Sequence, residues 1–322
     1  MTRRRFLVSS SVAAAAAAVL PSKILGQTTA PNPSSSATAL PKIGCYGPRI
    51  FVKFQLGTDA LLDAAKAAGF DSVEMLGGGS GAARVRGKPE APEAIRDKLA
   101  ARGLVSTVGS LVVPEKTPHA EAVAQTRAQI TRMNKIGQNY ALCGGFSDEE
   151  QWIPFCKVLR DAAEFGQDLG VQIVTKHHHG LNNTTVELLG WLQQVNHPNF
   201  RLFFDPGNLI YYTGKDPLKQ LDLIAPHVTG WVAKDCAGPI YQERMSGQPG
   251  FGDAPPNPNG DEVMIQFGTG RVNFPGVYRK LKSTGFNGVI YVEGTVAGDT
   301  VEATIAAARA NREYLVKALS QA

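Results

Sequence analysis

Residues 169–176 are Leu169-Gly170-Val171-Gln172-Ile173-Val174-Thr175-Lys176, a glycine joint followed by a short β-branched run. Glycine readily closes a helix, and a short apolar run after it is typical of a buried strand. The same joint recurs in Ala68-Gly69-Phe70 and in Thr284-Gly285-Phe286. A helical stretch that ends in glycine and leads directly into a strand indicates repeated βα units and a parallel sheet.

Such units recur about every 30 residues after residue 40. Amphipathic helices are expected between the strands, among them Thr58–Ala68 and Ser147–Leu169. The eight predicted strands are Lys42–Tyr46, Ser72–Leu76, Val105–Ser110, Asn139–Cys143, Val171–His177, Arg201–Asp205, Thr229–Lys234 and Gly288–Glu293.

Eight βα units with right-handed crossovers close most simply into a (β/α)8 TIM barrel, here a single domain over residues 41–322. A doubly wound open sheet is the alternative. The first βα turn has no G-x-G-x-x-G phosphate fingerprint, and residues 77–81 (GGGSG) indicate only a flexible loop. The count and spacing of the strands therefore favour the barrel.

The N-terminus has the pattern of an export signal. A basic patch that contains Arg3-Arg4-Arg5-Phe6-Leu7 precedes an apolar run from Val8 to Leu20. Paired arginines followed by Phe-Leu indicate a twin-arginine signal peptide, and about 13 apolar residues are short of the roughly 20 that a retained membrane anchor needs. We predict a signal peptide over residues 1–27 and a flexible linker over 28–40. The protein is then periplasmic or otherwise extracytoplasmic, without membrane attachment after signal cleavage.

The basic charge of the chain belongs mostly to this signal. The whole chain carries a formal net charge of +5, of which Arg3, Arg4, Arg5 and Lys23 supply four. A domain near +1 lacks the electrostatic footprint of a protein that binds nucleic acid. We therefore expect a small-molecule partner and no nucleic acid.

Polar residues at the ends of the predicted strands are the candidates for chemistry, because in a barrel these ends meet at one mouth. Asp205 either caps the next helix or serves the site, and Glu293 would be costly there unless it is paired or bound to a metal. The Gly/Pro-rich connection between Lys234 and Asn273 is predicted to cover this mouth as a lid. The candidates are Glu74, Lys176-His177-His178-His179, Asp205, Asn208, Lys234-Asp235 and Glu293.

Three consecutive histidines follow the fifth predicted strand. Side chains alternate along a strand, so Lys176 and His178 are expected on one face, and His177 and His179 on the other. Imidazoles beside carboxylates suit a transition metal. The alternative is that these histidines are simply hydrogen-bonded within a loop.

The chain resembles the xylose isomerase-like TIM barrels, a superfamily of sugar phosphate isomerases and epimerases. In that family a divalent metal is typically held by a glutamate after the fifth strand, an aspartate after the sixth, a histidine on the seventh and a glutamate after the eighth. Asp205 and Glu293 match two of these positions, whereas Lys176 and Val232 stand at the other two. The resemblance lies in residues 67–74, 170–178, 204–208, 232–235, 267–274 and 291–293.

The resemblance implies an isomerase- or epimerase-like enzyme that abstracts a proton next to a carbonyl of a sugar or keto-sugar. We assign catalysis to Glu293 and Lys176. A divalent metal (Mn, Zn, Co or Mg) is assigned to His178, Asp205 and Glu293, unless the Lys176 ammonium replaces its charge. The predicted substrate contacts are His177, Asn208, Lys234 and Glu74.

Other functions stay open at this point. One is a lyase or hydratase that acts on a keto-glycoside. Another is a non-catalytic sugar-binding barrel, which would use aromatic stacking surfaces. An AP endonuclease of the same superfamily is disfavoured by the nearly neutral domain, and a homo-oligomer is also open. The aromatic candidates for stacking are Trp152, Trp191, Trp231 and Tyr211-Tyr212.

Overall fold

The computed structural model describes residues 41–78, 85–146, 148–238 and 263–322. Its strands form one parallel sheet of eight, in the order β2-β1-β8-β7-β6-β5-β4-β3. Hydrogen bonds from the Val73 and Met75 amides to the carbonyl oxygens of Val105 and Val108, 2.9 and 2.7 Å long, continue the pairing from β2 to the β3 side. The sheet is thereby closed into a (β/α)8 TIM barrel. The strands are β1 (Ile43–Cys45), β2 (Ser72–Val73), β3 (Val108–Leu111), β4 (Tyr140–Cys143), β5 (Gln172–Thr175), β6 (Phe200–Phe204), β7 (Val228–Ala233) and β8 (Val289–Val292).

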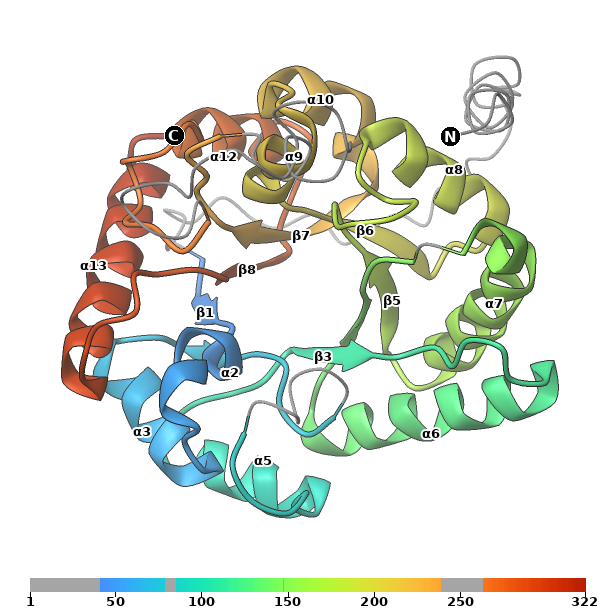
Figure 1. Ribbon diagram of the computed structural model, residues 1–322, viewed down its shortest axis with the longest axis horizontal. Coiled ribbons are helices and arrows are strands. Elements are labelled where there is room, and N and C mark those ends of the chain that lie inside the picture. The colour runs from blue at the N-terminus through green and yellow to red at the C-terminus, as the bar shows by residue number, and fades with distance from the viewer. Residues whose placement is uncertain (1–40, 79–84, 147, 239–262) are drawn as a thin grey trace, which may run out of the picture.

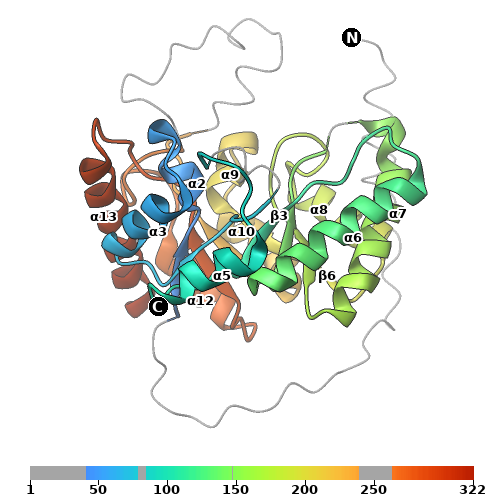
Figure 2. The same cartoon turned by 90° about the horizontal axis from the view of Figure 1, so that it is seen from below.

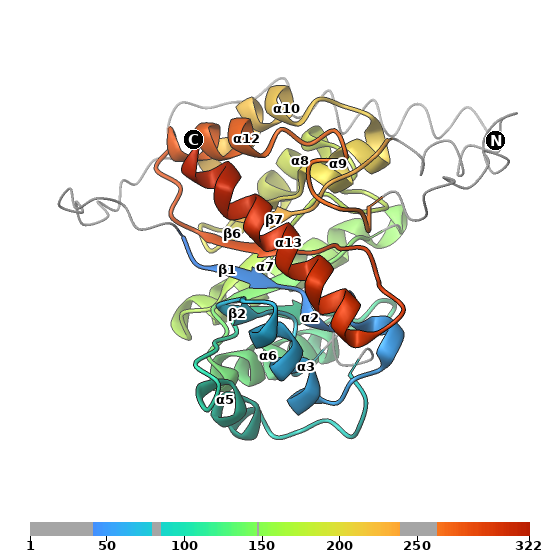
Figure 3. The same ribbon diagram turned by 90° about the vertical axis from the view of Figure 1, so that its left-hand side faces the viewer.

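The helices form an outer layer around the strands (Figure 1). Seen from below, α3, α5 and α6 follow one another along one side of the barrel (Figure 2). The C-terminal helix α13 runs along the outside and packs against α12 and α3 (Figure 3). No helix in the described ranges has the length and apolarity needed to cross a bilayer. The helices are α2 (Gly47–Ile50), α3 (Thr58–Ala67), α5 (Pro92–Ala100), α6 (His119–Ile136), α7 (Trp152–Asp168), α8 (Thr185–Val195), α9 (Pro206–Thr213), α10 (Pro217–Ile224), α12 (Phe274–Lys282) and α13 (Val301–Ser320).

The unit α7–β5 shows how the glycine joint works. Gly170 has a φ of 68°, in the left-handed region that glycine adopts without strain, and it turns the chain from α7 into β5. The helix begins later than predicted, because a short 3-10 turn over Glu149–Gln151 precedes it. Asp148 caps this turn, accepting hydrogen bonds from two of its amides, whereas Ser147 lies outside the described residues.

All eight predicted strands are confirmed, with ends that differ by up to three residues. The prediction was wrong at the end of β2, which stops at Val73 because Met75 has a φ of 63° and leaves the extended conformation. The predicted signal peptide and linker, residues 1–40, lie outside the described residues. So do residues 239–262 of the predicted lid.

An apolar layer fills the interior of the barrel. Because side chains alternate, the residue two positions beyond an inward-facing residue also faces inward, nearer the mouth. Val174, Val232 and Tyr291 therefore lie one layer below Lys176, Lys234 and Glu293. The interior cluster consists of Tyr46, Met75, Val108, Leu142, Val174, Phe203, Val232 and Tyr291.

Candidate active site

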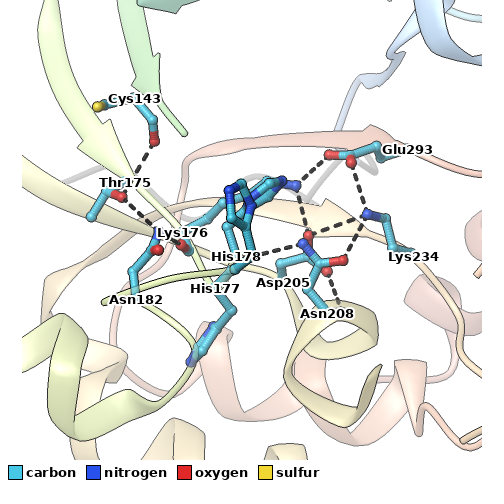
Figure 4. Close-up of polar contacts among 11 residues, drawn as sticks. Cys143, Thr175, Lys176, His177, His178, Asn182, Asp205, Asn208, Lys234 and Glu293 are labelled. Atoms are coloured by element: carbon cyan, nitrogen blue, oxygen red, sulfur yellow. Dashed lines mark hydrogen bonds and ion pairs between the residues drawn. The ribbon is translucent and has the colours of Figure 1, made fainter. Parts of the chain in front are cut away.

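Four charged side chains meet above this apolar layer. Lys176, Asp205, Lys234 and Glu293 directly follow β5, β6, β7 and β8, which are neighbours in the sheet. Figure 4 shows them converging from their separate strand ends. They are buried, with exposures of 4%, 0%, 3% and 6% in the same order. We call this group the tetrad.

Hydrogen bonds and ion pairs link all members of the tetrad. Lys176 Nζ donates to Asp205 Oδ2 at 2.7 Å and to Glu293 Oε2 at 2.5 Å. Lys234 Nζ donates to Glu293 Oε1 at 2.7 Å and lies 3.7 Å from Asp205 Oδ2. Each lysine therefore contacts both carboxylates. The two positive and two negative charges balance, which is the condition under which buried charges are tolerated.

Asp205 caps helix α9, so its capping role is confirmed, and it is also a member of the tetrad, where its site role stays a prediction. Its Oδ1 accepts a hydrogen bond of 2.9 Å from the Asn208 amide, which caps helix α9, while its Oδ2 faces Lys176. Asn208 extends the network, because its Oδ1 accepts from Lys234 Nζ at 2.9 Å and its Nδ2 donates to the His177 carbonyl at 2.8 Å. The first turn of α9 thus holds the tetrad in place.

The surroundings shift the pKa values of the two lysines in opposite directions. Burial acts to lower the pKa of Lys176, but the carboxylates of Asp205 and Glu293 together raise it above its ordinary value. Burial lowers the pKa of Lys234 more than these carboxylates raise it, and the charges of Lys176 and Arg49 lower it further. Burial acts to raise the pKa of Glu293, yet Lys176 and Lys234 hold it well below its usual range. Lys176 is therefore the more permanent cation, and Lys234 is the lysine that releases its proton more readily.

Asp235 fixes the chain directly after β7. Its fully buried carboxylate accepts hydrogen bonds of 2.9 to 3.1 Å from the amide of Cys236 and from three amides between residues 268 and 272. A buried carboxylate that satisfies several backbone donors is costly to remove. Asp235 therefore ties residues 268–272 to the end of β7 and restrains Lys234 beside it. The sequence marked Asp235 as a strand-end residue, but its partners are too far along the chain to be inferred.

Glu74 has a structural role in place of the predicted substrate contact. Its carboxylate is fully buried and accepts hydrogen bonds from the Ser72 hydroxyl at 2.6 Å and from the Val108 amide at 2.6 Å. The amide and hydroxyl of Thr107 also donate to it, at 2.8 and 2.9 Å. Burial raises the pKa of this carboxyl group. With these four donors bound, Glu74 joins β2 to β3 where the barrel closes.

The His177 ring points away from the tetrad, so its position gives no support to the predicted substrate contact (Figure 4). It is fully buried, with its ring edge-on to Phe204 and its Nε2 3.4 Å from the Thr185 hydroxyl. Burial, aided by the charge of Lys176, lowers the pKa of His177 to about 3, so the ring is neutral. The prediction from side-chain alternation that His177 and Lys176 face opposite sides is confirmed.

His178 lies on the tetrad side, where alternation placed it (Figure 4). It is half-buried, and its Nδ1 is 2.5 Å from Nδ1 of His179. The two rings are adjacent, so the prediction that His179 faces the opposite way was wrong. β5 ends at Thr175, and the alternation that still separates His177 from Lys176 and His178 is lost at His179. Burial and then the charge of Lys176 lower the pKa of His178 to about 3.

Comparison with known proteins identifies the family. The family described as "xylose isomerase-like TIM barrel" matches residues 62–317, most of the chain. The chain belongs to this family. Among curated proteins, the rhizopine catabolism protein MocC of Rhizobium meliloti is 28% identical over 144 residues, 45% of this chain and 43% of that protein. The similarity thus spans less than half of either chain.

Solved structures of the same fold include L-ribulose 3-epimerase, with a TM-score of 0.64, 14% identity and coverage of 87% of this chain and 95% of that chain. The IOLI protein, solved with a bound zinc atom, has a TM-score of 0.65 and 14% identity, with coverage of 87% and 98%. At this level of identity the likeness establishes the shared barrel. The chemistry has to come from the side chains of this chain.

The donor set at the tetrad does not fit the divalent metal that the family implies. The two ammonium nitrogens lie between the carboxylates of Asp205 and Glu293, and an ammonium has no lone pair to offer a metal. Nδ1 of the third predicted ligand, His178, faces His179. Within the described ranges, no three or more His, Cys, Asp or Glu side chains are grouped so that they could hold a metal ion.

Proposed function

We propose that this protein is an exported enzyme of the sugar isomerase/epimerase type that abstracts a proton next to the carbonyl of a keto-sugar. The observation that carries the proposal is the tetrad, which combines two cations with two carboxylates at the mouth of the barrel. Proton abstraction next to a carbonyl turns the substrate into an enediolate and leaves a negative charge on the former carbonyl oxygen. Fixed positive charge in a water-poor site stabilises that oxygen strongly.

Lys176 is the proposed electrostatic group. Its pKa is raised by Asp205 and Glu293, so it keeps its proton throughout the reaction. The ammonium then donates a hydrogen bond to the developing oxyanion. It supplies the positive charge that the family resemblance assigns to a metal ion. Its two carboxylate partners hold the nitrogen in position before the substrate arrives.

Lys234 is the proposed proton carrier. A general base works best when its pKa is near the working pH, and burial lowers the pKa of Lys234 toward that range. Glu293 is a weaker base in this setting, because Lys176 and Lys234 depress its pKa. In this assignment Glu293 orients both lysines, which modifies the catalytic role that the sequence suggested for it.

The fate of the abstracted proton decides the reaction class. Returning it to another carbon or to the other face gives isomerisation or epimerisation, whereas loss of a β-substituent from the same enediolate gives a lyase. The non-catalytic sugar-binding alternative loses support, because Trp191 and Trp231 are fully buried in the core and Trp152 packs edge-on against Trp191. Trp191 and Trp231 are therefore unavailable as stacking surfaces, whereas Trp152 is partly exposed.

Hydrogen exchange with solvent tests the proton abstraction directly. Incubation in D₂O with ketose substrates is expected to introduce deuterium at the carbon next to the carbonyl, detected by NMR or mass spectrometry. The Lys234→Met variant serves as the control, since it lacks the amine that is the proposed base. An active substrate that is turned over without any exchange would contradict the enediolate mechanism, including its lyase form.

The export part of the proposal rests on the arginine pair and the apolar run that follows it. Replacing Arg3, Arg4 and Arg5 by lysine is expected to retain the protein in the cytoplasm, because the twin-arginine route reads the arginines themselves. Cell fractionation followed by immunoblotting measures the outcome. Unchanged export of the lysine variant would contradict the assignment of this route.

A further inference from the structure

Arg49 stands beside the tetrad at the mouth of the barrel. It lies in α2, which one residue, Tyr46, separates from β1, and β1 pairs with β8. The Tyr46 amide donates to the Val292 carbonyl at 2.8 Å, which holds the start of α2 against the end of β8. Arg49 follows Tyr46 by three residues, and Glu293 follows Val292 directly. The charge of Arg49 accordingly lowers the pKa of Glu293.

Arg49 has a buried side-chain nitrogen without a partner in the part of the chain that the structure describes. Its Nε is buried without a hydrogen-bond acceptor, and no carboxylate forms an ion pair with it there. Glu293 is the nearby candidate, but Lys234 and Lys176 already occupy its Oε1 and Oε2. A buried donor without an acceptor is costly and rare, so the pairing of the carboxylate with the lysines leaves Arg49 for a ligand.

Charge and geometry define the ligand that Arg49 would accept. Arg49 adds one positive charge to the tetrad, whose own charges cancel while Lys176 and Lys234 both keep their protons. A single negative charge on the substrate balances the site in this protonated state, in which the substrate binds, and Lys234 releases its proton before it acts as the base. The guanidinium fork matches the two oxygens of a carboxylate, whereas a phosphate dianion would leave an excess negative charge.

We propose that the substrate carries a carboxylate, which Arg49 binds, and is therefore a keto-sugar acid. The carboxylate is held on the β1–β8 side of the mouth, while the ketone lies over the two lysines of the tetrad. This inference rests on the proposed function for the position of the ketone. The buried Arg49 Nε, which has no acceptor among the described residues, is an independent observation.

Matched probes test the inference by binding alone. 2-Keto-D-gluconate and D-fructose share a carbon skeleton and differ in whether C1 is a carboxylate, and D-fructose 1-phosphate places a phosphate there. Isothermal titration of the purified protein is expected to show binding of 2-keto-D-gluconate about 10–100-fold tighter than binding of D-fructose. Arg49→Gln is expected to abolish this preference, and Arg49→Lys to retain part of it. Arg96→Gln, an exposed change on α5, is the matched control and leaves it intact.

Several results would overturn the inference. They are equal affinity for the acid and D-fructose, absence of binding of 2-keto-D-gluconate at millimolar concentration, tighter binding of the phosphate ester, and an acid preference that survives in a folded Arg49→Gln protein. The proposed function fails separately. An acid preference without solvent exchange would contradict the proton abstraction alone, whereas exchange into D-fructose without any acid preference would contradict the role of Arg49 alone.

Discussion

Replacing Lys176 by methionine is expected to lower the rate of solvent deuterium exchange by about 10²–10³-fold, the usual effect of losing one donor to an oxyanion. The same change removes the closest cation from Asp205, whose carboxylate is fully buried. Leaving such a charge without its partner is expected to cost about 3–5 kcal/mol of the free energy of unfolding. Exchange rates by NMR and urea unfolding curves measure the two effects.

Two further variants separate charge from fold. Lys176→Arg keeps a permanent cation between Asp205 and Glu293, so it is expected to retain more exchange activity than Lys176→Met. Lys157→Met, on the exposed side of α7, removes a lysine without touching the tetrad and is expected to behave as the wild type. Wild-type exchange in a stable Lys176→Met protein would show that this ammonium is not part of the chemistry.

Replacing Lys234 by arginine is expected to lower exchange by about 10²–10⁴-fold, the range that a general acid or base contributes. Arginine preserves the positive charge near Glu293 but does not lose its proton in a protein. Lys234→Met is expected to be as inactive as Lys234→Arg. Arginine is therefore expected to restore part of the activity at position 176 and none at position 234. If both lysines were merely structural, arginine would not distinguish the two positions in this way.

The pH profile gives a second readout for Lys234. Proton abstraction requires the neutral amine, so the exchange rate is expected to rise as the pH passes upward through the pKa of this lysine. Because burial lowers that pKa, the midpoint lies below the value of about 10.4 that is usual for lysine. The rise is expected to disappear in Lys234→Arg. A wild-type rate or an unchanged profile in this variant would remove Lys234 from the role of base.

The barrel was predictable from the sequence because its signals are local. Each glycine joint and each short apolar run lies within a few residues, and eight repetitions leave few topologies. Alternation correctly separated His177 from Lys176 and His178, but it wrongly grouped His179 with His177. The structure brings together Lys176, Asp205, Lys234 and Glu293, as expected from their positions at strand ends.

The remaining features depend on contacts that are distant in the sequence. Glu74 is at a strand end like Glu293, but amides from another strand bind its carboxylate, and nothing near Glu74 in the sequence indicates this. The histidines were harder to place because β5 ends before them. Arg49 was missed because α2 has only four residues and no periodicity to detect. Its position just after the first strand was the one available signal.

The central claim is that the Lys176 ammonium supplies the positive charge that the family resemblance assigns to a divalent metal. The most direct test is to measure the metal content of the purified protein and its rate of solvent exchange before and after dialysis against a chelator. The account predicts well below about 0.1 equivalent of divalent metal and an exchange rate that chelation leaves unchanged. One tightly bound equivalent, whose removal abolishes exchange and whose return restores it, would contradict the account.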